Sequence, residues 1–212
     1  MIKAQSFGGA KYWLLIVDNA TGFKFSYFLK KKSEVPKIIV RLIKHLKQTK
    51  GYVVKYLHCN NAGENLATEK ECLAAGLGVT FEYTASNTPQ QNGRMERHFA
   101  TLYGRVQSML NAAKLNQEFW KGLWAECAQM ATNFDNLDCE LKGETRFKAF
   151  YRYNDKAFKY IWKFGEVAIV TSGEKIQNKL KNCGILCLYL GQATVHSEKI
   201  AQFMKISIKQ VI

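Results

Sequence analysis

The sequence predicts an α/β fold, in which a sheet flanked by helices is followed by a small β-rich module. Strand-like and helix-like segments alternate through the first half, two long amphipathic segments follow, and the last third is strand-like. The 212 residues, 47% hydrophobic and 23% charged, suffice for one large domain with a small appendage. This composition excludes a disordered or collagen-like chain.

The first two strands are predicted to form an antiparallel hairpin. Residues 10–17 are a continuous apolar run of the length of a buried strand. Residues 23–29 alternate, with Phe23 and Phe25 separated by Lys24 and followed by Ser26. Residues 19–22 read Asn-Ala-Thr-Gly, which are residues typical of turns.

A helix is expected over residues 34–50, with Ser33 as its cap and Gly51 as its end. Its apolar residues recur at steps of three and four, and four cations lie opposite them: Lys37, Arg41, Lys44 and Lys47. Further strands are predicted at 52–58 and 79–84, separated by a turn at 59–63 and a short helix at 68–75.

The polar stretch 85–93 contains one of only two prolines and is predicted to be a mobile loop. Two amphipathic helices are expected after it, at 94–113 and 117–136. Residues 157–171, 184–191 and 200–212 are strand-like and are separated by polar turns that carry lysines. They predict the small β module.

Charge is the outlying property of the chain, because 31 Lys and Arg against 17 Asp and Glu give a net charge of +14. Residues 1–93 carry 13 basic and 6 acidic groups and residues 94–212 carry 18 and 11, so each part has an excess of 7. An excess spread over folded segments indicates a broad basic surface that suits a polyanion. Simple solubility is the alternative explanation.

Several function classes have no support in the sequence. The longest apolar runs have six residues, too few for a membrane span, and the first residues do not resemble a secretory signal. An intracellular protein with six reduced cysteines is therefore expected. No phosphate loop or GxGxxG motif indicates a nucleotide cofactor. Cys183 and Cys187 leave a weak alternative of structural zinc, and His58 beside Cys59 is not expected to form a catalytic pair because strand neighbours face opposite ways.

Two stretches carry a specific resemblance: YLHCNNAGEN at 56–65 and NTPQQNGRMERHFATLYGRVQSML at 87–110. Together they resemble the core of retroviral-type integrases, in particular those of copia-type retrotransposons. The opening SFGGAKYWLLIVDNATGFKFSYFLKKKSEV is similar to the same family, as are FWKGLWAECAQMATNFDN, WKFGEVAIV and KLKNCGILCLYLG. The resemblance implies an RNase H-like core with a mixed five-stranded sheet flanked by helices, and an SH3-like β module after it. The expected divisions are a core at 1–115, connecting helices at 116–150 and the module at 151–212.

The same resemblance implies metal-dependent DNA strand transfer, in which three carboxylates hold two Mg²⁺ or Mn²⁺ ions. Paired metals activate the attacking oxygen and stabilise the leaving one, and hard cations prefer carboxylate ligands. Glu96 matches the third carboxylate and metal ligand, while Asn60 stands where the family has an aspartate, with 35 residues between the two. By the same register the first aspartate falls before Met1, and the zinc-binding module typical of the family is absent. We therefore expect a catalytically impaired copy, or pseudo-enzyme, that does not hold the metals stably.

Neighbouring acids are weak substitutes for the missing ligands, because Asp18 is expected in the hairpin turn and Glu64 in the loop after Asn60. Nucleic-acid binding is expected to outlast catalysis. DNA, a homo-oligomeric assembly and a nuclear location are implied by the resemblance, and no membrane partner is expected. A non-catalytic DNA-binding or assembly module and an expressed transposon remnant are the alternatives. The candidate DNA-binding residues, with a solvated cationic face as the other reading, are Gln90, Gln91, Asn92, Arg94, Arg97, Arg105, Lys30, Lys31 and Lys32.

Overall fold

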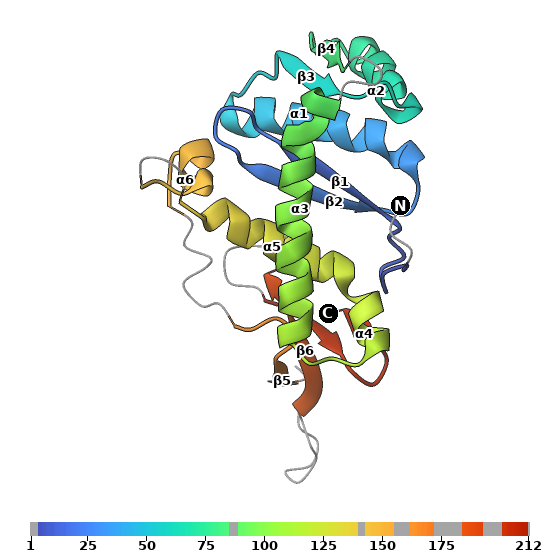
Figure 1. The fold of residues 1–212 in the computed structure, drawn as a ribbon, viewed down its shortest axis with the longest axis vertical. Coiled ribbons are helices and arrows are strands. Elements are labelled where there is room, and N and C mark those ends of the chain that lie inside the picture. Colours follow the sequence, from blue (N-terminus) through green and yellow to red (C-terminus); the bar gives the residue numbers. More distant parts are fainter. Residues whose placement is uncertain are drawn as a thin grey trace.

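The structure is a computed structural model of the whole chain. It describes residues 4–84, 89–139, 143–154, 162–171, 184–192 and 201–211, with the side chains of 89–92 and 210–211 left aside. Figure 1 shows a helical and strand-bearing upper part and a sheet at the lower end, where the chain terminates. Within the described residues, no helix is long and apolar enough to cross a membrane.

The predicted hairpin is confirmed. Strand β1 (Tyr12–Val17) pairs antiparallel with β2 (Lys24–Leu29), with Tyr12 opposite Leu29 and Val17 opposite Lys24. Asp18 closes the turn, since its Oδ2 accepts hydrogen bonds from the backbone N–H of Thr21 at 2.8 Å and from its hydroxyl at 2.6 Å. The turn residues thus set the register of the ladder.

The polar side chains of β2 are buried, which the alternation in the sequence does not indicate. Lys24 is 3% exposed and Ser26 is 9% exposed, because both face helix α5 (Trp124–Leu137). Lys24 forms an ion pair with Asp135, and the hydroxyl of Ser26 lies 2.7 Å from that of Thr132. Each buried polar group therefore has a partner on the helix.

Helix α1 (Val35–Lys50) follows a single 3-10 turn, η1 (Lys32–Glu34). The expected Ser33 cap is wrong, because Ser33 lies inside this turn and Glu34 is the residue before α1. Pro36 lies in the first turn of α1, where proline is well tolerated. Gly51 ends α1 as predicted, with φ of 68°. A left-handed residue at this position favours glycine.

Strand β3 (Tyr56–Cys59) pairs parallel with β4 (Thr80–Tyr83), and helix α2 (Gly63–Ala74) connects them. Helix α2 begins five residues before the predicted start, so the turn after β3 is short. Among the described residues, β1–β2 and β3–β4 form two separate ladders. This differs from the single five-stranded sheet that we expected, because no described strand hydrogen-bonds to both.

Helix α3 (Pro89–Ala112) begins before its predicted first residue. The loop prediction is therefore wrong for residues 89–93, since Pro89 fixes a backbone angle that suits the first turn of a helix. Residues 85–88 lie outside the described part. The second predicted helix is two helices, α4 (Gln117–Gly122) and α5, which meet at Leu123. Asn116 caps α4 by accepting a hydrogen bond from the Phe119 N–H.

Helix α6 (Arg146–Tyr151) was not expected from the sequence. Thr145 caps it, and its aromatic side chains pack on the hairpin and on the end of α1. The ring of Phe150 stacks on that of Phe23 at 4.7 Å between centroids, and its carbonyl accepts a hydrogen bond from the Tyr52 hydroxyl. This aromatic cluster attaches α6 to a surface more than 90 residues earlier in the chain.

The β-rich C-terminal part is an antiparallel sheet of order β5-β6-β7-β8 within the described residues. The strands are β5 (Val167–Thr171), β6 (Gly184–Gln192), β7 (Ala201–Lys205) and β8 (Gln210–Val211). The strand-like run at 157–171 is shorter than predicted, because residues 162–166 form a turn around Gly165, with φ of 74°. The run at 200–212 is divided by a turn at 206–209.

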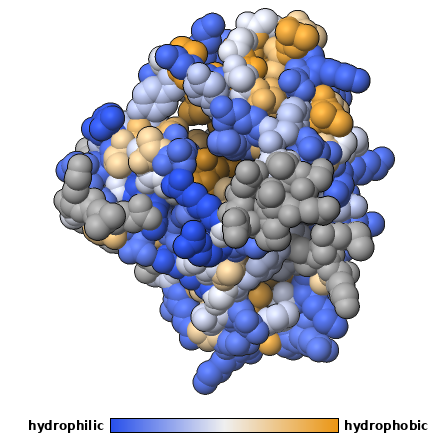
Figure 2. Space-filling model, turned by 45° about the horizontal axis from the view of Figure 1, so that its top comes forward, coloured by the Kyte–Doolittle hydropathy of each residue, from blue (hydrophilic) through white to orange (hydrophobic). Residues whose placement is uncertain are grey.

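Helices cover both faces of the β1–β2 hairpin (Figure 1). On one face, Ile39 and Ile43 of α1 pack with Leu14 and also with Leu57 of β3, so α1 supports both ladders. On the other face, Phe28 and Trp13 lie against α5 and α3. The space-filling view shows a largely hydrophilic surface with a hollow whose floor is apolar (Figure 2).

Candidate functional site

Asn60 lies directly after β3, where its side chain is used within its own loop. Its Oδ1 accepts hydrogen bonds from the backbone N–H of Ala62 at 3.3 Å and from Nδ2 of Asn65 at 2.8 Å. The same Nδ2 also donates to the Asn60 carbonyl at 3.0 Å. Asn60 therefore organises the entry to α2, and its oxygen already has partners.

Glu96 is exposed and lies two turns inside α3 rather than in the first turn as expected. The earlier start of α3 causes this difference. Stabilisation of a carboxylate by a helix dipole falls off within the first turn, so the dipole does not account for Glu96. Among the described residues, Glu96 has no ion-pair partner.

Residues close to Asn60 and to Glu96 line one cavity of about 460 Å³. Asn65, which bonds Asn60, and Phe99, which is three residues after Glu96, both line it. The aromatic wall of the cavity is held by Trp13, whose ring meets those of Phe99 and Tyr103 edge to face at 5.6 and 5.2 Å. The remaining lining comes from β1, the end of β2, η1 and the first residues of α1 and α2: Tyr12, Leu14, Leu29, Lys32, Val35 and Glu64.

The donors near this cavity do not fit a pair of divalent cations. Asn60 offers a neutral amide that is already hydrogen-bonded, and Glu96 is a single exposed carboxylate. Within the described ranges, no three His, Cys, Asp or Glu side chains are grouped closely enough to hold a metal. Mg²⁺ requires near-octahedral oxygen ligands with negative charge, which this set does not supply.

The two acids that were considered as substitutes have other roles. Asp18 holds the hairpin turn through Thr21. Glu64 forms an ion pair with Lys32 at 3.0 Å across the cavity wall. Burial works to raise the pKa of Glu64, but a backbone hydrogen bond and the Lys32 ammonium outweigh it and lower this pKa.

Cys59 and His58 do not form a nucleophilic pair. His58 Nε2 lies 2.8 Å from Oε2 of Glu82, its partner across the β3–β4 ladder. Burial, with a smaller contribution from Glu69, raises the pKa of the Cys59 thiol to about 11. The thiol is therefore protonated at neutral pH and is a poor nucleophile. Cys183, of the weak zinc alternative, lies outside the described residues.

The predicted DNA-binding cations differ in their exposure and in whether they are bound to other side chains. Lys30, Lys31 and Arg97 are exposed, whereas Lys32 is paired with Glu64. Arg94 donates to the side chain and the carbonyl of Asn19, the latter at 3.3 Å. Arg105 forms an ion pair with Asp138 at 2.6 Å, and this carboxylate competes with a phosphate for the Arg105 guanidinium. Gln90, Gln91 and Asn92 belong to the first turns of α3, and their side chains lie outside the described part.

A larger basic feature lies on α1. Its exposed face carries four cations, Lys37, Arg41, Lys44 and Lys47, and the helix contains no acidic residue. In the described part of the chain, none of the four has an ion-pair partner. Lys30 and Lys31 lead into the same helix. We call these four residues the α1 stripe. Their spacing is visible in the sequence, where it also fits the solvent side of an amphipathic helix.

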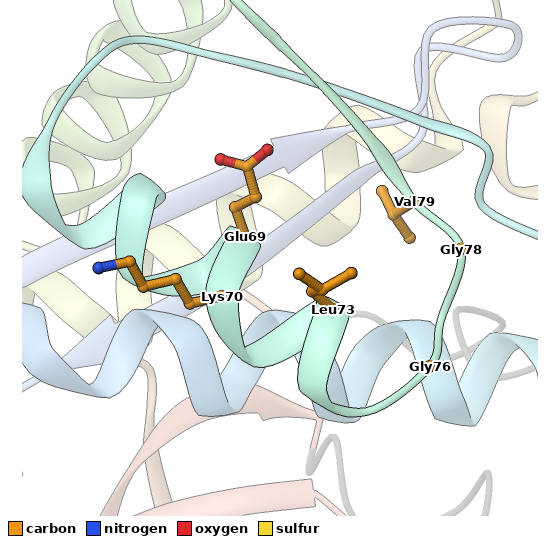
Figure 3. Close-up of a pocket in the computed structure, with 6 residues that line it drawn as sticks. All are labelled: Glu69, Lys70, Leu73, Gly76, Gly78 and Val79. Atoms are coloured by element: carbon orange, nitrogen blue, oxygen red, sulfur yellow. The ribbon is translucent and has the colours of Figure 1, made fainter.

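A second pocket, of about 570 Å³, lies between the end of α2 and the segment that leads to β4 (Figure 3). Its lining consists of Glu69, Lys70, Leu73, Gly76, Gly78 and Val79. Glu69 and Lys70 point away from Leu73, and Glu69 accepts a hydrogen bond from the Tyr83 hydroxyl at 2.7 Å. The pocket therefore holds no convergent polar groups of the kind that fix a ligand.

A buried charge network joins β2, α3, α5 and α6, and the sequence did not indicate it. Asp135, 2% exposed, pairs with Lys24, with Arg146 at 3.2 Å and with Arg105 at 3.4 Å. Asn136 doubly bonds the backbone of Lys24, accepting from its N–H at 2.8 Å and donating to its carbonyl at 2.9 Å. Lys24 and Asp135 are 111 residues apart in the sequence, so only the folded chain brings them together.

No family model matches the chain. A retrovirus-related Pol polyprotein from transposon TNT 1-94 of Nicotiana tabacum is 27% identical over 191 residues, which are 90% of this chain and 14% of that polyprotein. The chain thus spans about one seventh of that relative. The catalytic core domain of BIV integrase, a solved structure, shares 20% identity with a TM-score of 0.46 over 65% of this chain and 83% of its own. The polyprotein match confirms that the chain resembles part of a retrovirus-related Pol polyprotein of a transposon.

Proposed function

We propose that the chain is an RNase H-like integrase-type domain that binds DNA through the α1 stripe and does not itself carry out strand transfer. One observation carries the second part: Asn60 is a neutral residue whose oxygen is committed to Ala62 and Asn65. The SH3-like character of the C-terminal sheet, a homo-oligomeric assembly and a nuclear location belong to the same proposal.

Loss of catalysis follows from the donors rather than from the fold. Strand transfer of the implied kind needs negatively charged oxygens that hold two metal ions. Position 60 supplies none, and Glu96 is one carboxylate alone. The Asn60 side chain only accepts hydrogen bonds in this loop, so Asn60→Asp would keep both contacts, but one of the three carboxylates would still be missing.

DNA binding is supported by cations that have no ion-pair partner among the described residues. The α1 stripe presents four cations on one helical face, and Lys30 and Lys31 lie at the entrance to this helix. A helix displays such residues at steps of three and four, so they follow one another along its exposed side. Contacts of this kind bind phosphates without reading base sequence. The affinity should therefore depend on salt and little on DNA sequence.

The test of binding is a salt titration with a labelled duplex, using a variant in which all four residues of the α1 stripe are changed to Gln. The slope of log K against log salt should fall by about 0.9 for each phosphate contact removed. A control variant changes four exposed lysines elsewhere to Gln and alters the net charge equally: Lys70, Lys114, Lys121 and Lys163. If both variants lose affinity equally, binding reflects net charge and the α1 stripe is not the DNA surface.

The test of catalysis uses the wild-type chain with a DNA substrate and Mg²⁺ or Mn²⁺. We expect no strand-transfer or end-processing product with either metal. DNA binding should persist when the metals are removed with EDTA, because the cations of the α1 stripe require none. Formation of product by the purified chain would overturn the loss of catalysis but would leave DNA binding to be judged by the salt titration.

A further inference from the structure

The edges of the two N-terminal ladders are open toward each other. Asp18 N–H donates to Phe23 at 2.8 Å and continues the register of the hairpin, so every second residue back from Asp18 faces β2. The alternate residues direct their N–H and C=O groups to the opposite edge. These residues are Trp13, Leu15 and Val17.

Strand β3 also has one edge that faces away from its partner strand β4. Thr80 N–H donates to Lys55 at 2.8 Å and Thr84 N–H donates to Cys59 at 2.9 Å, so residues 55, 57 and 59 face β4. Tyr56 and His58 therefore point their backbone groups away from β4. Within the described residues, neither open edge has a hydrogen-bonded neighbour.

The two open edges belong to one layer. Leu14 of β1 and Leu57 of β3 pack against the same α1 cluster, which includes Ile39 and Ile43. In Figure 1, β1 and β3 run in opposite directions across this helix. A strand placed between them would be antiparallel to β1 and parallel to β3, and would convert two ladders into one mixed sheet.

The 460 Å³ cavity lies at this gap. Successive residues of β1, Tyr12 and Trp13, both line it although they face opposite sides of the strand, so the cavity lies at an edge of β1. β2 occupies one edge, and the other wall of the cavity is the start of α2, directly after β3. We call the gap between β1 and β3, with this cavity, the strand slot.

We propose that the strand slot is a binding site for an extended peptide segment that adds to both edges as a β-strand. The occupant is an uncharged, predominantly apolar segment of about five residues, the length of the strands beside it. Its side chains on one face would meet Val35 of α1, and those on the other face would meet Phe99 and Tyr103. A strand with apolar layers on both faces requires apolar residues at successive positions.

Charge complementarity supports an uncharged occupant. The only charged residues that line the cavity are Lys32 and Glu64 within the described part, and they neutralise each other at 3.0 Å. The backbone supplies the affinity instead, since five residues of the two edges offer donors and acceptors that have no partner among the described residues. Main-chain hydrogen bonds give affinity in this mode of recognition, and alternate side chains select the sequence.

The probe is the peptide Gly-Val-Ile-Val-Ile-Val-Gly-amide with fluorescein at its N-terminus, which has five successive apolar residues and no charged side chain. Its binding to the full chain is followed by anisotropy. We expect saturable binding, and binding weaker by about fivefold or more for the same peptide with proline at its central valine, because proline cannot donate to the ladder. In the protein, Tyr56→Pro removes one outward N–H at the first residue of β3, where proline is tolerated. It should weaken binding about fivefold or more, the effect of one lost backbone hydrogen bond. The matched control, Tyr56→Ala, keeps the N–H and should bind as the wild type does.

Amide exchange measured by NMR locates the peptide. In the free chain, the N–H groups of Leu14 and Ile16, which face β2, should be protected, and those of Trp13, Leu15 and Val17 should exchange faster. Saturation with the peptide should protect the second set and leave the first unchanged. Equal binding of the proline peptide, or no added protection at the second set, would overturn the proposal. A dimer in sedimentation with the second set already protected would also overturn it and would assign the strand slot to a second copy of the chain.

Discussion

Replacement of Asp135 by Asn is expected to be the most destabilising conservative change in the charge network. Asp135 is 2% exposed and lies against three cations: Lys24, Arg146 and Arg105. The amide keeps the shape of the carboxylate but removes its charge. Lys24, whose side chain is also 2% exposed, is then left with a buried ammonium beside a neutral group.

The magnitude follows from this asymmetry. Breaking a buried ion pair by removing one partner costs about 3–5 kcal/mol, because the other charge stays in the protein interior. Lys24→Met should cost less, since Asp135 keeps Arg146 at 3.2 Å and Arg105 at 3.4 Å. For a chain of this size, roughly 4 kcal/mol corresponds to a fall in Tm of about 8–16 °C.

Urea unfolding followed by tryptophan fluorescence provides the free energies of unfolding. The matched control is Asp138→Asn, which makes the same chemical change in a neighbouring carboxylate. A hydrogen bond from Arg105 lowers the pKa of Asp138 despite opposing burial, but this side chain is half exposed and its loss should cost less than about 1 kcal/mol. If Asp135→Asn and Asp138→Asn cost the same, burial does not govern the network and the reasoning fails.

Two further predictions concern packing and pH. At Gly122, an added Cβ would lie 2.4 Å from the ring of Phe7, so Gly122→Ala should lower the free energy of unfolding by about 1–3 kcal/mol. Gly104 lies inside α3 with open space at its Cβ, so Gly104→Ala should raise the free energy of unfolding by roughly 0.5–1 kcal/mol. Urea unfolding of both variants checks this, and a stabilising Gly122→Ala would contradict the contact with Phe7. Burial raises the pKa of Glu126, whose Oε2 has no hydrogen-bond partner in the described part of the chain. Its contribution to stability is therefore present below its unfolded pKa of about 4.3 and is lost as the pH rises through the folded pKa. The free energy of unfolding of Glu126→Gln relative to wild type should increase from pH 4 to pH 7, and a difference independent of pH would refute the assignment.

The sequence predicted most of the helices and strands whose formation depends on residues close together in the chain. The hairpin follows from an apolar run, a turn sequence and an alternating run, and α1 follows from its regular spacing and from Gly51. The motif singled out Asn60 and Glu96, whose neighbours Asn65 and Phe99 line one cavity in the structure. What the motif did not reveal is that the Asn60 side chain bonds Asn65, because this bond depends on where α2 begins.

The predictions from the sequence were wrong at residues that are common in two different structural settings. Pro89 and the amides after it are common in loops, but proline is equally suited to the first turn of a helix, and α3 starts there. Leu123 continues an amphipathic pattern through a break between α4 and α5. Lys24 looked like a solvent-facing residue because its partner, Asp135, comes from a distant helix. Tertiary partners of this kind are not encoded in a local window.

Helix α5 is buried on two sides, and this has a practical consequence for dividing the chain. It contacts β2 through Thr132 and Asp135, while Cys127 and Met130 share a core with Leu190 and Met204 of the C-terminal sheet. A shortened protein that ends near residue 150 would therefore carry an uncovered apolar helix face into solution. Such faces promote aggregation. Expression of the whole chain, or of a version that retains β5 to β8, keeps both sides of α5 covered.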